Sequence, residues 1–360
     1  MMSWAPFLLL WFTLFFGRIF AEQQCTESII PSWNAGTQIQ SFFTQWQAHN
    51  IHNATLCFIG GIYTFDVAVQ VPTGFSLYLV GISTVNETFL SAAELGSLFY
   101  LIPTVNLVSI KNLHCTDSYV SGFSGQALWF EAINVVFEGG QQAINIYASR
   151  FIFQNSYVKG FNNPMGGFGA VEVQKLFYAS ITNSTFIEND AASGDPGGCG
   201  AGLSLFGINE AVASAYIDFC IFEKNNAPAG GGALVVQDMS LTVINSSFIE
   251  NIAGSNVLLM GGAISYTGPS LMIFYSNFTL NNASCGGAAL AASVSNIFTI
   301  TGSLFSENDS DHTCMNNLPI NATLIYHGIA PQMLEVVFAE NMCRQAPDSE
   351  FTLCVNVSSF

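Results

Sequence analysis

The stretch Val243-Ile244-Asn245-Ser246-Ser247-Phe248-Ile249-Glu250-Asn251-Ile252-Ala253 contains the pattern that decides the fold. At its centre a Phe is followed three residues later by an Asn, and the chain carries six such pairs: Phe186 and Asn189, Phe222 and Asn225, Phe248 and Asn251, Phe278 and Asn281, Phe305 and Asn308, Phe338 and Asn341. The Phe residues lie 36, 26, 30, 27 and 33 residues apart. This spacing predicts one supersecondary unit per copy, stacked on its neighbours to bury a shared face.

Alignment of the units on their Phe residues gives columns of like residues. An apolar residue stands five positions before each Phe: Ile181, Ile217, Val243, Ile273, Ile300 and Met333. Strand residues alternate between two faces, so the odd offset requires a corner if the Phe is also to point inward. The small residues two positions before the Phe, such as Ser246, suit that corner. We expect the Asn to adopt the left-handed region and to bond its amide to the Asn one turn away.

Several short strands per unit, joined by corners, predict an all-β fold: a single-stranded right-handed parallel β-helix of about ten turns. Ile39, Phe42, Phe43 and Trp46 have helical spacing after Thr37, a candidate N-cap, and predict a short helix that closes the N-terminal end. An ordinary amphipathic surface helix is the alternative. The expected organisation is a signal peptide at 1–21, an N-terminal cap at 22–55 and the β-helix domain at 56–360.

The repeats resemble those of the chlamydial polymorphic outer membrane proteins, in which Gly-Gly-Ala-Ile alternates with Phe-x-x-Asn. Gly261-Gly262-Ala263-Ile264 matches in full and Gly231-Gly232-Ala233-Leu234 nearly so, and the likeness covers about residues 165–345. The earlier strands, such as 56–63 and 75–81, look like the opening turns of pectin-lyase-like β-helices. The membrane barrel of the outer membrane family has no match here, so the resemblance implies only an exposed β-helical protein with a role in surface display or adhesion.

The N-terminus and the sequons favour a secreted glycoprotein. An apolar run from Ala5 to Phe16 and the site Ile19-Phe20-Ala21 predict a cleaved signal peptide, with an uncleaved anchor as the alternative. Nine acceptor sequons follow, at Asn53, Asn86, Asn183, Asn245, Asn277, Asn282, Asn308, Asn321 and Asn356. All nine cysteines lie after the cleavage site, and in an oxidising compartment some of them should pair.

Charge excludes some partners. The formal net charge is −17, yet only 9% of residues are charged, and seven Lys and Arg are too few for a phosphate-binding patch. Nucleic acid is therefore not expected, nor is a membrane span after signal cleavage. Calcium at Asp190, Asp309 or Asp311 lacks a regular ligand spacing, so we expect no metal and no cofactor. Glycans, cell-surface or matrix proteins, and a second copy at the C-terminal end are the candidate partners.

Two functions from different classes compete. The favoured one is a non-catalytic protein for adhesion, wall or matrix structure, or glycan binding. The alternative is a divergent carbohydrate-active enzyme, a pectin-lyase-like lyase or glycoside hydrolase, for which Asp218 and Asp238 could share a face on successive strands. A groove with two carboxylates within about 10 Å of each other would favour the enzyme. An aromatic strip on an outer face would favour glycan binding without turnover.

Overall fold

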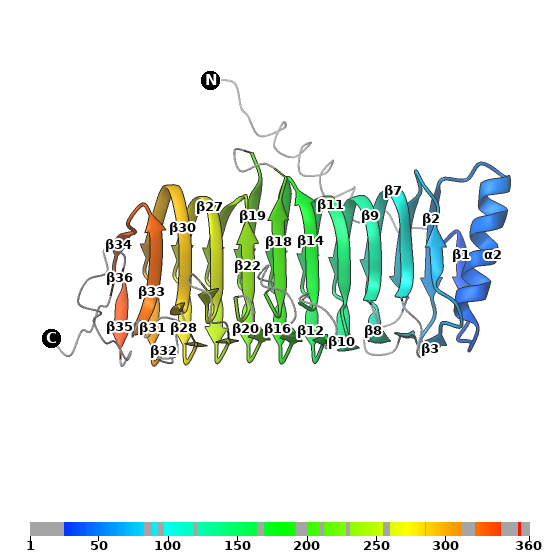
Figure 1. Cartoon of the computed structure of the whole chain (residues 1–360). Coiled ribbons are helices and arrows are strands. Elements are labelled where there is room, and N and C mark those ends of the chain that lie inside the picture. The colour runs from blue at the N-terminus through cyan, green and yellow to red at the C-terminus, as the bar shows by residue number, and fades with distance from the viewer. Residues whose placement is uncertain are drawn as a thin grey trace, which may run out of the picture.

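The computed structural model describes residues 25–82, 88–92, 97–118, 121–163, 169–191, 200–208, 212–227, 231–254, 260–284, 286–310, 321–339 and 352–353. Within these ranges the chain is nearly all β, with three sheets and one helix, α2 (Ala35–Ala48). The strands stack along one long axis, from α2 at the blue end to β35 at the orange end (Figure 1). The predicted signal peptide lies outside the described residues.

The described strands form three sheets, and successive units of the chain add successive strands to these sheets. The first sheet has 19 described strands: β1 (Glu27–Ile29), β2 (Asn53–Phe58), β4 (Val69–Val71), β5 (Ser76–Gly81), β7 (Ser97–Lys111), β9 (Ser121–Ile133), β11 (Ile144–Gln154), β14 (Val171–Leu176), β15 (Tyr178–Thr182), β18 (Leu203–Gly207), β19 (Ser214–Asp218), β22 (Leu234–Gln237), β23 (Ser240–Ile244), β26 (Met260–Gly261), β27 (Ile264–Phe274), β30 (Gly286–Thr301), β33 (Asn321–Gly328), β34 (Gln332–Leu334) and β36 (Thr352–Leu353). The second has 11 within the same ranges: β3 (Gly61–Thr64), β6 (Thr88–Ser91), β8 (His114–Ser118), β10 (Val136–Gly140), β12 (Tyr157–Lys159), β16 (Thr185–Ile187), β20 (Ile221–Glu223), β24 (Ser247–Ile249), β28 (Asn277–Thr279), β31 (Leu304–Ser306) and β35 (Val337–Ala339). The third has six: β13 (Asn162–Asn163), β17 (Asp190–Ala191), β21 (Asn226–Ala227), β25 (Ile252–Ala253), β29 (Asn282–Ala283) and β32 (Asp309–Ser310).

Pairing between the strands is parallel and joins one unit to the next. Phe222 of β20 is in register with Phe186 of β16 on one side and with Phe248 of β24 on the other. The chain therefore advances by one strand spacing per unit, as in a parallel β-helix. At the C-terminal end β36 pairs with β33 in the antiparallel sense, covering Leu324 and Ile325.

The six Phe residues of the repeat form a continuous stack in the core. Phe186, Phe222, Phe248, Phe278 and Phe305 are fully buried, and Phe338 at the end is 6% exposed. Successive ring centroids lie 4.8, 4.9, 4.9, 4.7 and 5.0 Å apart, with the planes within 15° of parallel. The ring separation matches the strand spacing, because each ring is attached to a strand of the same parallel sheet.

A second internal stack consists of the Asn residues. Asn189, Asn225, Asn251 and Asn281 each donate from Nδ2 to Oδ1 of the next Asn, at 2.9, 2.9, 3.0 and 3.0 Å. Asn341 lies outside the described residues. The same Asn251 Nδ2 also donates to the carbonyl of Phe222 at 2.9 Å, one turn earlier. These bonds satisfy amides that are otherwise buried without water.

The expected backbone conformation of these Asn residues was wrong. The left-handed residue is the one before each Asn, with φ between 52° and 56° at Glu188, Lys224, Glu250, Leu280 and Glu307. The Asn side chain has to point inward to bond its neighbours, so the exposed residue before it makes the turn.

The corner before the Phe combines a turn residue with a buried Ser in four of the six units, at Ser184, Ser246, Ser276 and Ser303. The residue three positions before the Phe has positive φ, for example 47° at Asn245 and 51° at Tyr275. The next residue, Ser246, accepts the N–H of Cys220 from the preceding turn at 3.1 Å and donates to the carbonyl of Ile244 at 2.7 Å. The small residues of this column thus bond successive corners together.

The N-terminal end of the stack is covered by α2. Its residues Phe43 and Trp46 are buried and pack on Phe75, with ring centroids 5.2 and 5.9 Å away. Thr37 is not the N-cap: the helix begins at Ala35, and the Thr37 N–H instead donates to Asp66 at 3.0 Å. A disulfide joins Cys25 to Cys57 of β2, which spans the expected boundary between cap and β-helix.

Candidate functional site: an aromatic and cationic face

The two acids considered for catalysis lie at opposite ends of neighbouring strands. Asp218 ends β19 and is in register with Ile244, the last residue of β23. Asp238 lies just before β23 begins, in an exposed turn with φ 57°. Six residues of strand separate the two positions, which corresponds to about 20 Å. The two carboxylates are therefore too far apart to act as a pair on one glycosidic bond, because the turn places Asp238 at the other end of the strand.

Other carboxylates on the first sheet are also far apart. Glu131 is in register with Ile152 of β11, whereas Glu172 is in register with Asn145 of the same strand. Seven residues of strand, or roughly 23 Å, separate these positions along the sheet. Glu131 is bonded to Lys111 at 3.0 Å, and Glu172 is 1% exposed. Neither pair approaches the separation of the carboxylates in a glycoside hydrolase.

The acids considered for calcium are separated as well. Asp190 begins β17 and Asp309 begins β32, and three strands of the third sheet lie between them. Asp190 accepts a hydrogen bond from Asn226 at 3.1 Å, and its partial burial raises the pKa of its carboxyl. Asp311 lies outside the described residues. Among the described residues no group of three or more His, Cys, Asp or Glu is placed to hold a metal ion.

The first sheet instead presents aromatic and cationic side chains on its outer surface. The guanidinium carbon of Arg150 in β11 lies 4.4 Å from the ring centroid of Trp129 in β9 and 5.3 Å from that of Tyr178 in β15. These three residues are in register on adjacent strands, so their side chains lie beside one another. Both distances fall within the range of cation–π contacts.

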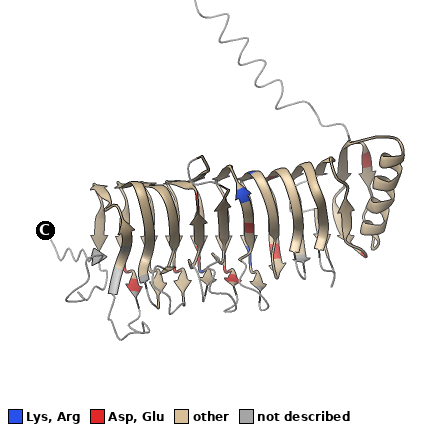
Figure 2. Cartoon of the chain, turned by 45° about the horizontal axis from the view of Figure 1, so that its top comes forward, with Lys and Arg blue, Asp and Glu red and all other residues tan. Residues whose placement is uncertain are grey.

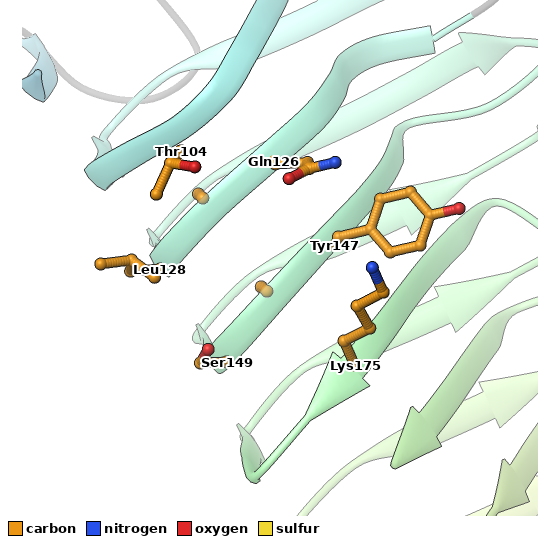
Figure 3. Close-up of a pocket in the computed structure, with 8 residues that line it drawn as sticks. Thr104, Gln126, Leu128, Tyr147, Ser149 and Lys175 are labelled. Carbon is orange, nitrogen blue, oxygen red and sulfur yellow. The ribbon is translucent and has the colours of Figure 1, made fainter. Parts of the chain in front are cut away.

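A second cation–aromatic pair lies next to the first. Lys175 of β14 places its Nζ 4.7 Å from the ring centroid of Tyr147 in β11. Figure 3 shows these two side chains pointing toward each other beside a shallow depression. We call Trp129, Tyr147, Arg150, Lys175 and Tyr178 the aromatic–cationic face.

The small volume of the depression limits the kind of ligand that this face can bind. Its volume is about 130 Å³, and it is lined by Thr104, Gln126, Ala127, Leu128, Tyr147, Ala148, Ser149 and Lys175. Pockets that enclose small molecules usually measure about 300–1,000 Å³. The site therefore suits a ligand that lies along the surface and contacts the protein on one side.

Strand alternation with one change of phase explains why these side chains point outward, because the buried residues of β11 are even-numbered up to Ala148 and odd-numbered from Phe151. Ile146, Phe151 and Phe153 of β11 are buried in the core, which leaves Tyr147 and Arg150 on the outer surface. Backbone turns mark the same edge, with φ 71° at Thr104 and 61° at Lys175. The residues of the face thus lie along a corner of the solenoid.

The sequence patterns did not identify this face, because it precedes most of the units aligned on Phe-x-x-Asn. One signal could have found it. Trp129 and Arg150 are 21 residues apart, as are the buried Phe130 and Phe151, and this shared offset would have placed Trp129 and Arg150 side by side. Figure 2 shows how few charged residues lie on the ribbon, which makes two cations on adjoining strands a notable concentration.

The sequons differ in accessibility. Asn53, Asn183 and Asn245 are exposed, while Asn277 and Asn282 are half-buried. Asn308 is fully buried, and its Nδ2 donates to the carbonyl of Phe278 at 2.8 Å, so it is not available for glycosylation in the folded chain. Asn86, Asn356 and the side chain of Asn321 lie outside the described residues. Among the described residues no helix has the length and apolar character to cross a bilayer.

Comparison with known proteins gives only distant likenesses. No protein-family model and no curated protein sequence matches the chain. The surface adhesin PfbA of Streptococcus pneumoniae is 7% identical with a TM-score of 0.35, over 89% of this chain and 97% of that one. The A-module of the Azotobacter vinelandii mannuronan C-5 epimerase AlgE4 is 12% identical with a TM-score of 0.30, over 86% of this chain and 94% of that one. Both scores are too low to bear on function.

Proposed function

We propose that this protein is a secreted, N-glycosylated, non-catalytic β-helix protein that binds glycans through its aromatic–cationic face, in surface adhesion or in wall or matrix structure. The observation that carries the proposal is the stack of Trp129, Arg150 and Tyr178 across three adjacent strands. Aromatic rings that keep one apolar face in contact with water are suited to a ligand with both C–H and hydroxyl groups, as sugars have.

The exposure of the rings supports this role. Trp129, Tyr147 and Tyr178 are 36%, 37% and 38% exposed, so each side chain packs on the protein over part of its surface and meets solvent over the rest. Gln126 and Thr104 add hydrogen-bonding groups at the edge of the depression. Rigid aromatic residues lose little conformational entropy on binding, and Trp, Tyr and Arg contribute strongly to recognition surfaces.

The disulfide supports the secreted location. Structural disulfides persist in oxidising compartments, and the Cys25–Cys57 bond ties the N-terminal segment to β2. The proposal retains the winding predicted from the sequence, a right-handed parallel β-helix of about ten turns with repeats of the polymorphic outer membrane protein type. Self-association at the C-terminal end also remains a prediction.

The proposal is tested by replacing Trp129 with Ala and measuring binding to an array of defined oligosaccharides. Loss of a central aromatic residue is expected to weaken binding by about tenfold or more. Tyr275→Ala is the matched control, because Tyr275 is a 62% exposed aromatic on another corner and should leave binding unchanged. Equal binding by Trp129→Ala and wild type, or no binding to any glycan, would refute the proposal. Cleavage of a bound oligosaccharide would instead favour the carbohydrate-active enzyme.

A further inference from the structure

The cations of the described chain divide into two groups. Lys111 lies 3.0 Å from Glu131, Lys159 lies 3.6 Å from Glu188, and Lys224 lies 3.3 and 3.9 Å from two further carboxylates. Arg150 and Lys175 have no carboxylate within 4.0 Å among the described residues. The net charge of the chain is −17, and within the described ranges both cations that lie near no carboxylate belong to the aromatic–cationic face.

The arrangement of Arg150 leaves its hydrogen-bond donors available. Arg150 contacts Trp129 and Tyr178 through their rings, and no hydrogen bond or ion pair with another described residue engages its guanidinium N–H groups. Arg150 is exposed, so a ligand can reach these N–H groups. A planar fork of N–H donors binds a carboxylate or a sulfate through two parallel hydrogen bonds.

Lys175 supplies a second positive charge at a defined separation. Tyr147, which holds Lys175, precedes Arg150 by three residues in β11, so the two cationic groups lie roughly 10 Å apart along the strand. One extended oligosaccharide can therefore contact both, with the sugar ring between its acidic groups lying over the depression.

The nearby acids do not repel such a ligand strongly. Glu131 is neutralised by Lys111, at 3.0 Å. The carboxyl of Glu172 is buried, and burial raises its pKa above the ordinary value, which favours the uncharged form. Charges elsewhere on the chain are screened beyond about 10 Å at 0.1 M salt.

We propose that the aromatic–cationic face selects anionic glycans, with Arg150 holding a carboxylate or sulfate group in its fork and Lys175 pairing with a second acidic group on the same chain. This inference rests on the proposed function, because it assigns the ligand class of the same face. Uronic or sialic acid sugars and sulfated sugars share the chemistry, and separate probes distinguish them.

The test is calorimetric titration of the full chain with four probes: a hyaluronan hexasaccharide, a heparan sulfate hexasaccharide, sialyllactose and neutral chitohexaose. Wild type should bind at least one anionic probe about tenfold more tightly than chitohexaose. Arg150→Gln and Lys175→Gln should each weaken that binding by about tenfold and weaken the binding of chitohexaose by a smaller factor. Lys159→Gln, which removes a carboxylate-paired Lys of the second sheet, is the control and should change nothing.

Further variants separate the possible failures. Arg150→Lys keeps the charge but loses the fork, so its affinity should lie between those of wild type and Arg150→Gln, and unchanged thermal melting would show that each variant folds. Equal binding of neutral and anionic probes, weakened only by Trp129→Ala, would overturn the inference and leave the proposed function standing. Absence of binding to the three anionic probes would overturn the inference, and absence of binding to every glycan of the array would overturn the proposed function as well. The probe that binds tightest shows whether a carboxylate or a sulfate is recognised.

Discussion

Replacing Phe248 with Ala would remove the middle of the aromatic stack. Phe248 is fully buried, and its ring lies 4.9 Å from both Phe222 and Phe278, with planes within 2° of parallel. Truncating a buried Phe generally costs about 3–5 kcal/mol. The loss of two stacked neighbours, each worth about 0.5–1.5 kcal/mol, places the expected loss toward the upper part of that range.

The assay is urea denaturation followed by circular dichroism, with Phe338→Ala as an internal comparison. Phe338 ends the stack, is 6% exposed and contacts a single stacked ring, that of Phe305, at 5.0 Å. Its truncation should therefore reduce the free energy of unfolding by less than that of Phe248. Phe248→Leu keeps much of the volume and should also cost less, at about 1–2 kcal/mol.

Two results would refute this reasoning. A loss below about 1 kcal/mol for Phe248→Ala would mean that the ring is not held in a close-packed core, since such a core cannot relax to fill the cavity without cost. A loss at Phe338 equal to that at Phe248 would mean that the stacked neighbours contribute nothing. An altered denaturant slope would show that the variant unfolds in parts, as solenoids can.

Three further predictions concern buried polar groups and the disulfide. Asn251→Asp should lower the free energy of unfolding, measured by denaturant melts near neutral pH, by about 3 kcal/mol or more, because a buried carboxylate would face the carbonyl of Phe222 and the Oδ1 of Asn281. This loss of stability should become smaller in acid, where the carboxyl is protonated. Burial raises the pKa of the Glu172 carboxyl in the folded state above its ordinary value of 4.5, so the stability that this group contributes is fully present below pH 4.5 and is lost as pH rises through the folded-state pKa. Glu172→Gln should flatten this pH dependence of the free energy of unfolding and stabilise the protein at pH 8. An unchanged pH profile would contradict the raised pKa of Glu172. Reducing the Cys25–Cys57 bond, which spans 32 residues, should lower the free energy of unfolding by about 4 kcal/mol, with the Cys25→Ser variant insensitive to reductant.

The repeated Phe-x-x-Asn phrase carried most of the information about the fold. Stacking requires the same residue at the same place in each turn, so the phrase in Phe222 and Phe248 already implied the register that the second sheet shows. The helix that contains Phe43 and Trp46 could be predicted for a similar reason, because apolar residues that recur every 3.6 positions form one buried face of an α-helix. The positive φ was assigned to Asn251 instead of Glu250, since the pattern alone does not say which residue turns and which points inward.

The aromatic–cationic face could not be predicted from the sequence in the same way. Stacking constrains inward residues and leaves outward ones free, so Trp129, Arg150 and Tyr178 follow no repeat, and only the parallel register brings them together from three strands. The same register moved Asp218 and Asp238 apart. By itself the sequence determined a stacked all-β chain with Phe and Asn columns, because those residues bond to their own copies. The tertiary structure decided which outer side chains meet, because their neighbours come from other turns and depend on the length of every loop between them.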